Sequence, residues 1–363
     1  MEDQMRKLGR DFSQKTLMPR WEASDAAATG VLGEILKEAA AAGLFGFSVP
    51  EEVGGAGLGA AEYRVFIEEI SRACAGIGAL LTAHFAGISP IVTAEGADAL
   101  ALLSHITAAE REGAPALFVP AVWEEAVEFV PEQVETTAAA SNGTYAINGG
   151  KTKVIGAAAA DCFTVLARDL KDGAYLWVVV PRGAKGVVVL PEAPRMGLRI
   201  CPVNNVTFND VEIPSANMIV RFTERGRLLD YHRAVDSVLA AVAIGMAAEA
   251  RETAMKYALE RYQGGKMICD HDVVRMLLSD MDMACSAARA FAYGTDAGFL
   301  ASAFAAEAAE KTCLNAVQIL GGYGYMKDYR IEKILRDAKT FSALLRMRAR
   351  RAEAVRGEIE KLR

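Results

Sequence analysis

Three glycines and a glutamine stand close together near the end of the chain. Gln318 precedes Gly321, Gly322 and Gly324, and an aromatic residue and an Arg-Asp-Ala-Lys string follow them. Glycine has no side chain, so such a cluster permits a tight turn or lets another molecule approach the backbone closely. The glycines alone leave both meanings open, a connector between two helices and a surface for a ligand.

Two further residues could carry acid–base chemistry. Asp236 lies in a long alanine-rich stretch, and His84 lies among apolar residues. A carboxylate can take a proton from carbon, and histidine changes its charge near neutral pH. A polar helix face or an ion pair between subunits would account for Asp236, and a core or pocket-lining position would account for His84. The six cysteines are scattered without a Cys-x-x-Cys pair, which indicates buried thiols and no metal site.

The composition narrows the class of protein. Of the 363 residues, 52% are hydrophobic and 24% are charged, which is typical of a globular chain with a large core. A net charge of −6 argues against nucleic acid as the main partner. The arginines between 346 and 351 are spaced as on a solvated helix face. We expect no signal peptide, no membrane-spanning helix and a cytoplasmic protein with reduced cysteines.

The elements that must position these residues change type twice along the chain. Hydrophobic spacing predicts helices in the first third, one of them with Ile35 and Leu36 on its buried face. Short β-branched runs predict strands in the middle, with a hairpin turn at Asn142-Gly143. Alanine-rich stretches predict four long helices at roughly 228–262, 271–298, 302–320 and 329–361. The predicted domains are an N-terminal helical domain at 1–114, a middle β-domain at 115–222 and a C-terminal helical bundle at 223–363.

Several strings in the chain point to one family. The stretch from Gln318 follows the pattern Gln-x-x-Gly-Gly-x-Gly, an aromatic residue and Arg-Asp-Ala-Lys. The glycine-rich string G-F-S-V-P-E-E-V-G-G-A-G-L-G starts at Gly46, and E-R-Y-Q-G-G-K around Arg261 follows Arg-x-x-Phe-Gly. In these strings the chain resembles the acyl-CoA dehydrogenase family from end to end. The resemblance implies an α+β multidomain fold with an N-terminal helical domain, a small middle β-barrel or sandwich and a C-terminal four-helix bundle.

The resemblance also implies an activity, a cofactor and partners. Members of the family oxidise the CH–CH bond beside an acyl-CoA thioester with FAD, which accepts the hydride. Residues that would contact the FAD of a neighbouring subunit are Arg261, Gln318, Gly321 and Gly322. His84 and Phe85 would lie at the acyl end of the substrate pocket. The likeness further implies a homo- or hetero-oligomer, with an electron-transfer flavoprotein as a partner to consider.

The chain departs from the family at the residues that take the proton. Alignment through the glycines and Arg261 puts the usual base positions at Leu345 and Val235, and both are apolar. Asp236 follows Val235 and is the candidate for a replacement base. One residue along a helix turns a side chain by about 100°, which counts against it.

The flavin contacts are altered as well. Lys153-Val154-Ile155 stands where the family has a Trp-Ile-Thr that meets the flavin. The loop from Phe118 to Phe129 lacks the family's hydroxyls and carries acidic residues where phosphates would approach. Gly264 replaces a phenylalanine, and Asp272 replaces a glutamine. Met347 and Ala349 replace the family's Thr-x-Gln.

These losses fall in the chain's own active site, whereas the residues that would reach a neighbour's FAD are kept. The pattern predicts the degenerate subunit of a heteromeric enzyme, which completes the FAD site of a partner. Two alternatives stay open. The chain could be an acyl-CoA flavoenzyme with an altered base or a non-redox reaction such as decarboxylation, or it could be a catalytically silent scaffold.

Overall fold

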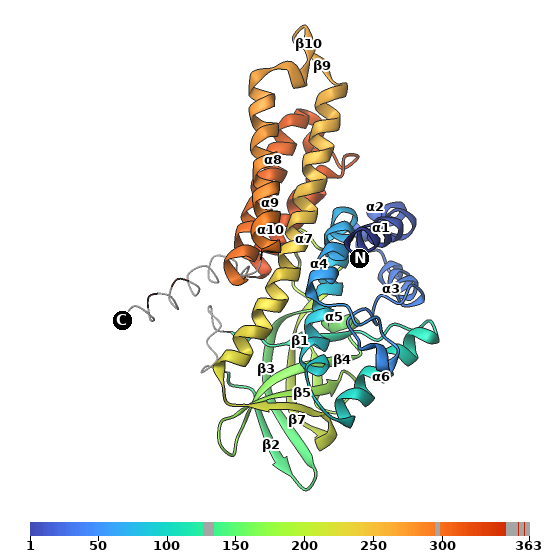
Figure 1. The fold of residues 1–363 in the computed structure, drawn as a ribbon, viewed down its shortest axis with the longest axis vertical. Helices are drawn as coiled ribbons and strands as arrows, with labels where there is room; N and C mark the ends of the chain where they lie inside the picture. The colour runs from blue at the N-terminus through green and yellow to red at the C-terminus, as the bar shows by residue number, and fades with distance from the viewer. Residues whose placement is uncertain (126–133, 295–297, 346–354, 356–358, 360–363) are drawn as a thin grey trace.

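The structure is a computed structural model in which residues 1–125, 134–294, 298–345, 355 and 359 are described. Figure 1 shows three parts, with a β-sheet at the bottom, a bundle of long helices at the top and the N-terminal helices beside their junction. The longest helix, α7 (Arg225–Glu260), runs from the sheet to the far tip of the bundle. The α+β multidomain fold expected from the sequence is confirmed.

The N-terminal part is helical and packs around an apolar core. Its α-helices are α1 (Glu2–Phe12), α2 (Trp21–Asp25), α3 (Val31–Ala41), α4 (Ala60–Ala73), α5 (Ala75–Val92) and α6 (Ala97–Arg111). Ile35 and Leu36 are buried on α3, as their spacing predicts. A glycine-rich loop connects α3 to α4, and at Gly55 a side chain would strike the Val49 carbonyl. That close approach explains why this loop needs glycine.

Helix α5 has the length and composition of a membrane span, although no membrane-spanning helix is expected from the sequence. Ala75–Val92 passes that test by length and hydropathy alone. In the fold 89% of this helix is buried, between α4, α7 and strand β1 (Phe118–Ala121). It is therefore the central core helix, apolar on every side because protein surrounds it.

The middle part is one connected sheet of eight strands. Its strands are β1, β2 (Thr137–Ser141), β3 (Thr144–Ile155), β4 (Cys162–Asp169), β5 (Tyr175–Pro181), β6 (Val187–Val189), β7 (Val203–Pro214) and β8 (Met218–Phe222). Their order is β6-β7-β3-β2-β4-β5-β8, and β1 pairs with β4 in parallel. The hairpin turn predicted at Asn142-Gly143 joins β2 to β3, and both residues have positive φ as a type I′ turn requires.

The C-terminal part is the predicted four-helix bundle. It consists of α7, α8 (Asp272–Tyr293), α9 (Gly298–Leu320) and α10 (Ile331–Leu344), with the short hairpin β9 (Tyr262–Gln263) and β10 (Lys266–Met267) at its tip. A 3₁₀ turn at Gly321–Tyr325 connects α9 to α10. The expected continuation of the last helix to residue 361, the arginines from 346 to 351 and the positions of Met347 and Ala349 lie outside the described residues.

Two glycines set how closely the central elements approach. A Cβ atom at Gly87 of α5 would lie 2.4 Å from the Phe118 carbonyl oxygen, and one at Gly245 of α7 would lie 2.4 Å from the Glu68 carbonyl oxygen. Any larger residue would push α5 from β1, or α7 from α4. These contacts therefore fix the walls of the cavity described below.

Helix α10 is attached to the middle part by the Arg-Asp-Ala-Lys string. The Asp337 carboxylate accepts a hydrogen bond from the Leu198 N–H at 2.6 Å and one from the Lys333 ammonium at 2.5 Å. Thr340 accepts a hydrogen bond from the Gly197 N–H at 2.9 Å. Burial would lower the pKa of Lys333, but the Asp337 charge outweighs it and raises the pKa. The string therefore forms a joint between the bundle and the β-domain.

Candidate functional site

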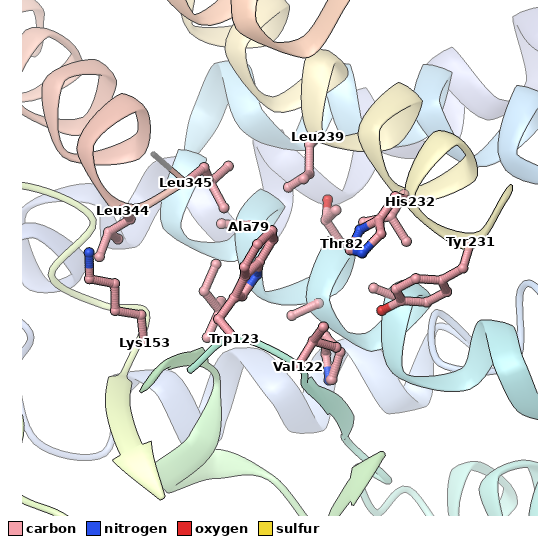
Figure 2. A pocket seen from close by; sticks show the side chains of 15 residues that line it. Ala79, Thr82, Val122, Trp123, Lys153, Tyr231, His232, Leu239, Leu344 and Leu345 are labelled. Atoms are coloured by element: carbon pink, nitrogen blue, oxygen red, sulfur yellow. The ribbon is translucent and has the colours of Figure 1, made fainter. Parts of the chain in front are cut away.

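An apolar cavity of about 60 Å³ lies where the three parts meet. Its walls come from α5, the segment after β1, β3, α7 and the end of α10 (Figure 2). Tyr231, His232, Val235 and Leu239 share one face of α7, at helical spacing. Thr82 and Lys153 are the polar residues that the other elements supply to its lining. The cavity occupies the place where the family resemblance implies the reacting end of the substrate.

Both positions that the resemblance assigns to the family's base open onto this cavity. Val235 and Leu345 are buried and line it from α7 and from the end of α10. The alignment made from the sequence therefore corresponds to a real meeting of two distant segments. Because both side chains are hydrocarbon, neither can accept a proton.

Asp236 lies outside this cavity. Its side chain is fully buried, and its Oδ1 accepts a hydrogen bond from the Ser302 hydroxyl of α9 at 3.4 Å. It does not appear in the cavity wall, because one step along α7 turns it toward the bundle. The structure therefore does not bring the replacement-base candidate to the place where a substrate would react.

His84 and Phe85 are also placed differently from the expectation that they line the substrate pocket. The cavity wall on α5 consists of Ala79, Thr82, Ala83 and Ala86, whereas His84 and Phe85 point into the core of the N-terminal part. The Phe85 ring stacks on Tyr63 at 5.0 Å between centroids. The pocket expectation is corrected for both residues, because helix rotation directs them away from the cavity.

His84 instead joins two backbone segments. The Phe118 N–H donates to His84 Nδ1 at 3.1 Å, and Nε2 donates to the Phe45 carbonyl at 2.9 Å. A proton on Nδ1 would face the Phe118 N–H, so the ring is a neutral structural group. Burial lowers the pKa of His84 to about 4, against the two backbone hydrogen bonds, which raise it.

This depressed pKa predicts a pH dependence of stability. Between pH 6.5 and about 4 the unfolded chain binds the proton that the folded ring refuses, so stability falls as the pH falls. We expect His84 to remove about 3 kcal/mol of unfolding free energy between pH 7 and pH 4. Urea unfolding of the wild type and of His84→Gln across this range tests it, with the exposed His105→Gln as the matched control. Equal slopes in the wild type and His84→Gln would contradict the assignment.

The acidic loop after β1 is tied down rather than facing an open site. The Glu124 carboxylate accepts hydrogen bonds from Lys151 Nζ at 2.6 Å, from the Thr136 hydroxyl at 2.8 Å and from the Glu135 N–H at 2.7 Å. Burial lowers the pKa of Lys151 to about 8, although the Glu124 charge opposes that shift. The sequence suggested that the acidic residues of this loop would repel phosphates. For Glu124 this does not hold, because the Lys151 ammonium neutralises its charge inside the fold. Residues 126–133 of the loop lie outside the described residues.

The cavity does not fit the redox ring of a flavin. Pockets for ligands of that size have volumes of about 300–1,000 Å³, whereas this one holds about 60 Å³. Figure 2 shows the Trp123 side chain in the middle of the lining residues, with Leu344 and Leu345 on the α10 side. Lys153, held at a positive φ by a hydrogen bond from its N–H to Asn205, lines the edge. The residues present fill the space that the ring would need.

A second hollow lies in the C-terminal part, away from the junction of the three parts. It is an open groove of about 750 Å³ at the tip of the bundle, between the end of α7, the start of α8 and the end of α9. All four residues expected to contact a neighbour's FAD line it, namely Arg261, Gln318, Gly321 and Gly322. The structure therefore brings together residues that are up to 61 positions apart in the sequence.

Arg261 presents a free charge to the groove. Its backbone is fixed by hydrogen bonds with Tyr257 and Ile268 at the point where α7 ends. Among the residues that the structure describes, no carboxylate or carbonyl bonds its guanidinium, and its nearest partner is the Tyr323 ring, 5.9 Å from the ring centroid. A guanidinium without an internal acceptor is suited to bind a phosphate.

The glycines next to Arg261 leave their backbone uncovered. A Cβ atom at Gly321 or at Gly322 would meet nothing within 4 Å, and Gly321 has φ +58°. Gly324, in contrast, packs against the Val317 carbonyl, where a Cβ atom would lie at 2.4 Å. A cation, an open backbone surface and the Gln318 amide fit the diphosphate and adenine end of a dinucleotide.

Two residues of these sites went unnoticed in the sequence. His232 lies in the cavity wall three residues before Val235, a spacing that puts both on one helix face. Its ring lies 5.7 Å from Trp123 and 5.8 Å from Phe299, between centroids. Tyr323 lines the groove from within the glycine cluster. Helical spacing could have indicated His232, whereas nothing in the sequence indicated what Tyr323 contacts.

Comparison with known proteins covers most of the chain. Residues 1–101, 122–211 and 228–344 match the N-terminal, middle and C-terminal domain models of acyl-CoA dehydrogenase. An acyl-CoA dehydrogenase of Bacillus subtilis is 32% identical over 352 residues, which span 92% of this chain and 91% of the relative. CarC of Acetobacterium woodii, a subunit of the caffeyl-CoA reductase-Etf complex, is 28% identical over 93% of this chain and 92% of its own length. Butyryl-CoA dehydrogenase of Megasphaera elsdenii has the same fold, with a TM-score of 0.84 at 24% identity over 98% of each chain.

Proposed function

The chain belongs to the acyl-CoA dehydrogenase family, and from that premise we propose that it is the degenerate subunit of a heteromeric acyl-CoA oxidoreductase. Members of this family are oxidoreductases that act on CH–CH groups of acyl-CoA thioesters. In the proposed assembly a second family member carries the complete active site. The present chain completes that site from across the subunit boundary.

The contrast between the cavity and the groove carries the proposal. The cavity at the junction of the three parts is about 60 Å³ and is lined by Trp123, Val235 and Leu345. The groove at the tip of the bundle is about 750 Å³, and among the described residues no carboxylate or carbonyl bonds the Arg261 guanidinium there. A scaffold that had lost every contact with the cofactor would have no reason to keep an uncompensated arginine beside uncovered glycines.

These residues suggest separate roles for the two subunits. FAD bound in the partner's site would supply a hydride acceptor for the acyl chain, and a carboxylate of the partner would take the proton. Arg261 of this chain would neutralise the diphosphate, and Gln318 would offer its amide to the adenine end. Gly321 and Gly322 let the nucleotide lie directly on the backbone. We propose an electron-transfer flavoprotein as the acceptor, since the relative CarC belongs to a complex with one, and a cytoplasmic assembly.

A second candidate function has one observation in its favour. His232 is a titratable side chain in the wall of the cavity, so it could act as the base of an altered acyl-CoA enzyme. Such an enzyme would need room for both substrate and flavin beside His232, and about 60 Å³ does not provide it. The scaffold without cofactor is the third candidate, and it would leave Arg261 without a purpose.

The flavin content of the purified protein tests the proposal. We expect the chain to be colourless alone, because its own cavity excludes the redox ring. Co-expressed with a family member that has the catalytic glutamate, it is expected to form a yellow complex with half a flavin per subunit. Absorption spectra and native mass together give this ratio.

The other outcomes separate the candidates. One flavin per subunit in the chain alone would overturn the proposal in favour of the altered enzyme, with His232→Gln as the next variant. A chain that stays colourless with every family member tested would identify the scaffold. Arg261→Ala in the complex is the matched control, since it alters the groove and leaves the cavity unchanged.

A further inference from the structure

Three tyrosines pack together beside the groove. The Tyr323 ring lies 6.2 Å from Tyr257 and 5.2 Å from Tyr329, between centroids. It is 44% exposed and lines the groove, whereas Tyr257 comes from the last turns of α7 and Tyr329 lies two residues before α10. Tyr323 is therefore supported by two rings and still open on the groove side.

The glycine turn determines where this ring lies. Gly321 takes a positive φ, and Gly324 packs on the Val317 carbonyl so closely that no side chain fits. These two constraints fold the 3₁₀ turn back toward the end of α7. As a result the Tyr323 ring contacts the guanidinium of Arg261, which lies 62 residues earlier in the chain.

We propose that Tyr323 is a positioning residue for Arg261. Its ring holds the guanidinium at the groove by a cation–π contact, in the orientation that meets a nucleotide diphosphate. An arginine otherwise free in solvent would lose rotamer freedom when it binds, and a preset orientation removes part of that loss. The inference rests on the proposed function, in which the diphosphate belongs to the FAD of the partner subunit.

A matched control lies two residues away. Tyr325 belongs to the same 3₁₀ turn, is 73% exposed and does not line the groove. Replacing it by leucine removes an aromatic ring from the same turn without touching Arg261. Tyr323→Phe keeps the aromatic face and loses the hydroxyl, so it should rescue what Tyr323→Leu loses.

The experiment is a double-mutant cycle in the complex of this chain with its glutamate-bearing partner. FAD is titrated into the flavin-free complex, and the dissociation constant is read from flavin fluorescence. We expect Tyr323→Leu to weaken FAD binding roughly two- to fivefold, with Tyr323→Phe and Tyr325→Leu close to the wild type. In the Arg261→Ala background Tyr323→Leu is expected to have no further effect. The Tm of each variant complex shows whether it is folded.

The other outcomes show whether the inference fails alone or together with the proposed function. If Tyr323→Leu weakens FAD equally with and without Arg261, the ring acts on its own and the inference is overturned, while the proposed function stands. If Arg261→Ala weakens FAD and Tyr323→Leu does not, the inference is again overturned alone. If Arg261→Ala leaves the affinity unchanged, the groove does not meet the FAD, and the proposed function falls together with the inference.

Discussion

Replacing Leu345 by glutamate is expected to destabilise the protein by about 3 to 5 kcal/mol and to restore no dehydrogenase activity. Leu345 is the position to which the resemblance assigns the family's base, so this is the obvious repair. The side chain is buried in an apolar wall, where a carboxylate would lose its hydration. The flavin ring would still have no room, because Trp123 occupies the cavity.

Unfolding by urea and a dye-reduction assay with acyl-CoA and added FAD measure the two effects. Leu345→Gln has nearly the same size without the charge and should cost less, and the difference should shrink as the pH falls and the glutamate takes a proton. Since Lys153 lines the same cavity, Leu345→Glu in a Lys153→Met background removes the nearest cation that could compensate. Bound flavin with turnover in Leu345→Glu alone would show that the cavity is not closed.

Asp337→Ala is expected to cost about 3 to 5 kcal/mol of unfolding free energy. Asp337 and Lys333 are both buried, and the carboxylate also accepts the Leu198 N–H. Removal of Asp337 leaves an ammonium group and a backbone donor without partners inside the protein. The loss should be seen in urea unfolding at neutral pH.

Two variants control this result. Lys333→Met with Asp337→Asn removes both charges and keeps an acceptor for Leu198, so it should recover most of the stability. Glu310→Gln breaks the more exposed ion pair with Lys339 and should cost less than about 1 kcal/mol. If Asp337→Ala also cost less than about 1 kcal/mol, Asp337 would not be needed to satisfy Lys333 and the Leu198 N–H, and the prediction would be wrong.

The fold could be predicted because its signals are local and repeated. Helical spacing around Ile35 and the turn residues Asn142-Gly143 each specify their own element. Composition alone could not decide the surroundings of α5, since uniform hydrophobicity is equally suited to lipid and to a core helix enclosed by protein.

The site could be predicted only in part. Alignment placed Val235 and Leu345 correctly at one cavity, because their spacing from fixed motifs carries over within the fold. The direction of single side chains could not be read in the same way: Asp236, His84 and Phe85 are each next to a residue of the cavity wall and point elsewhere. Residue type alone does not give the rotation of a helix that is buried on every side.

Contacts between segments far apart in the sequence were the hardest to predict. The contacts of Arg261 with Tyr323 and of Glu124 with Lys151 join segments far apart in the sequence, and they depend on the glycine turn and on the pairing of the strands. The Arg-Asp-Ala-Lys string was recognised as a family signature, but its role as a joint on Leu198 became clear only from the structure.

Under the proposed function, the two parts of helix α7 are subject to different selection. Its 36 residues extend about 54 Å and connect the small cavity, at His232 and Val235, to the groove, at Arg261. Selection on mutations near the cavity acts only through packing and stability, whereas selection on mutations near the groove acts through catalysis by the partner subunit. If the partner gene were lost, only the residues of the groove would be expected to accumulate substitutions freely.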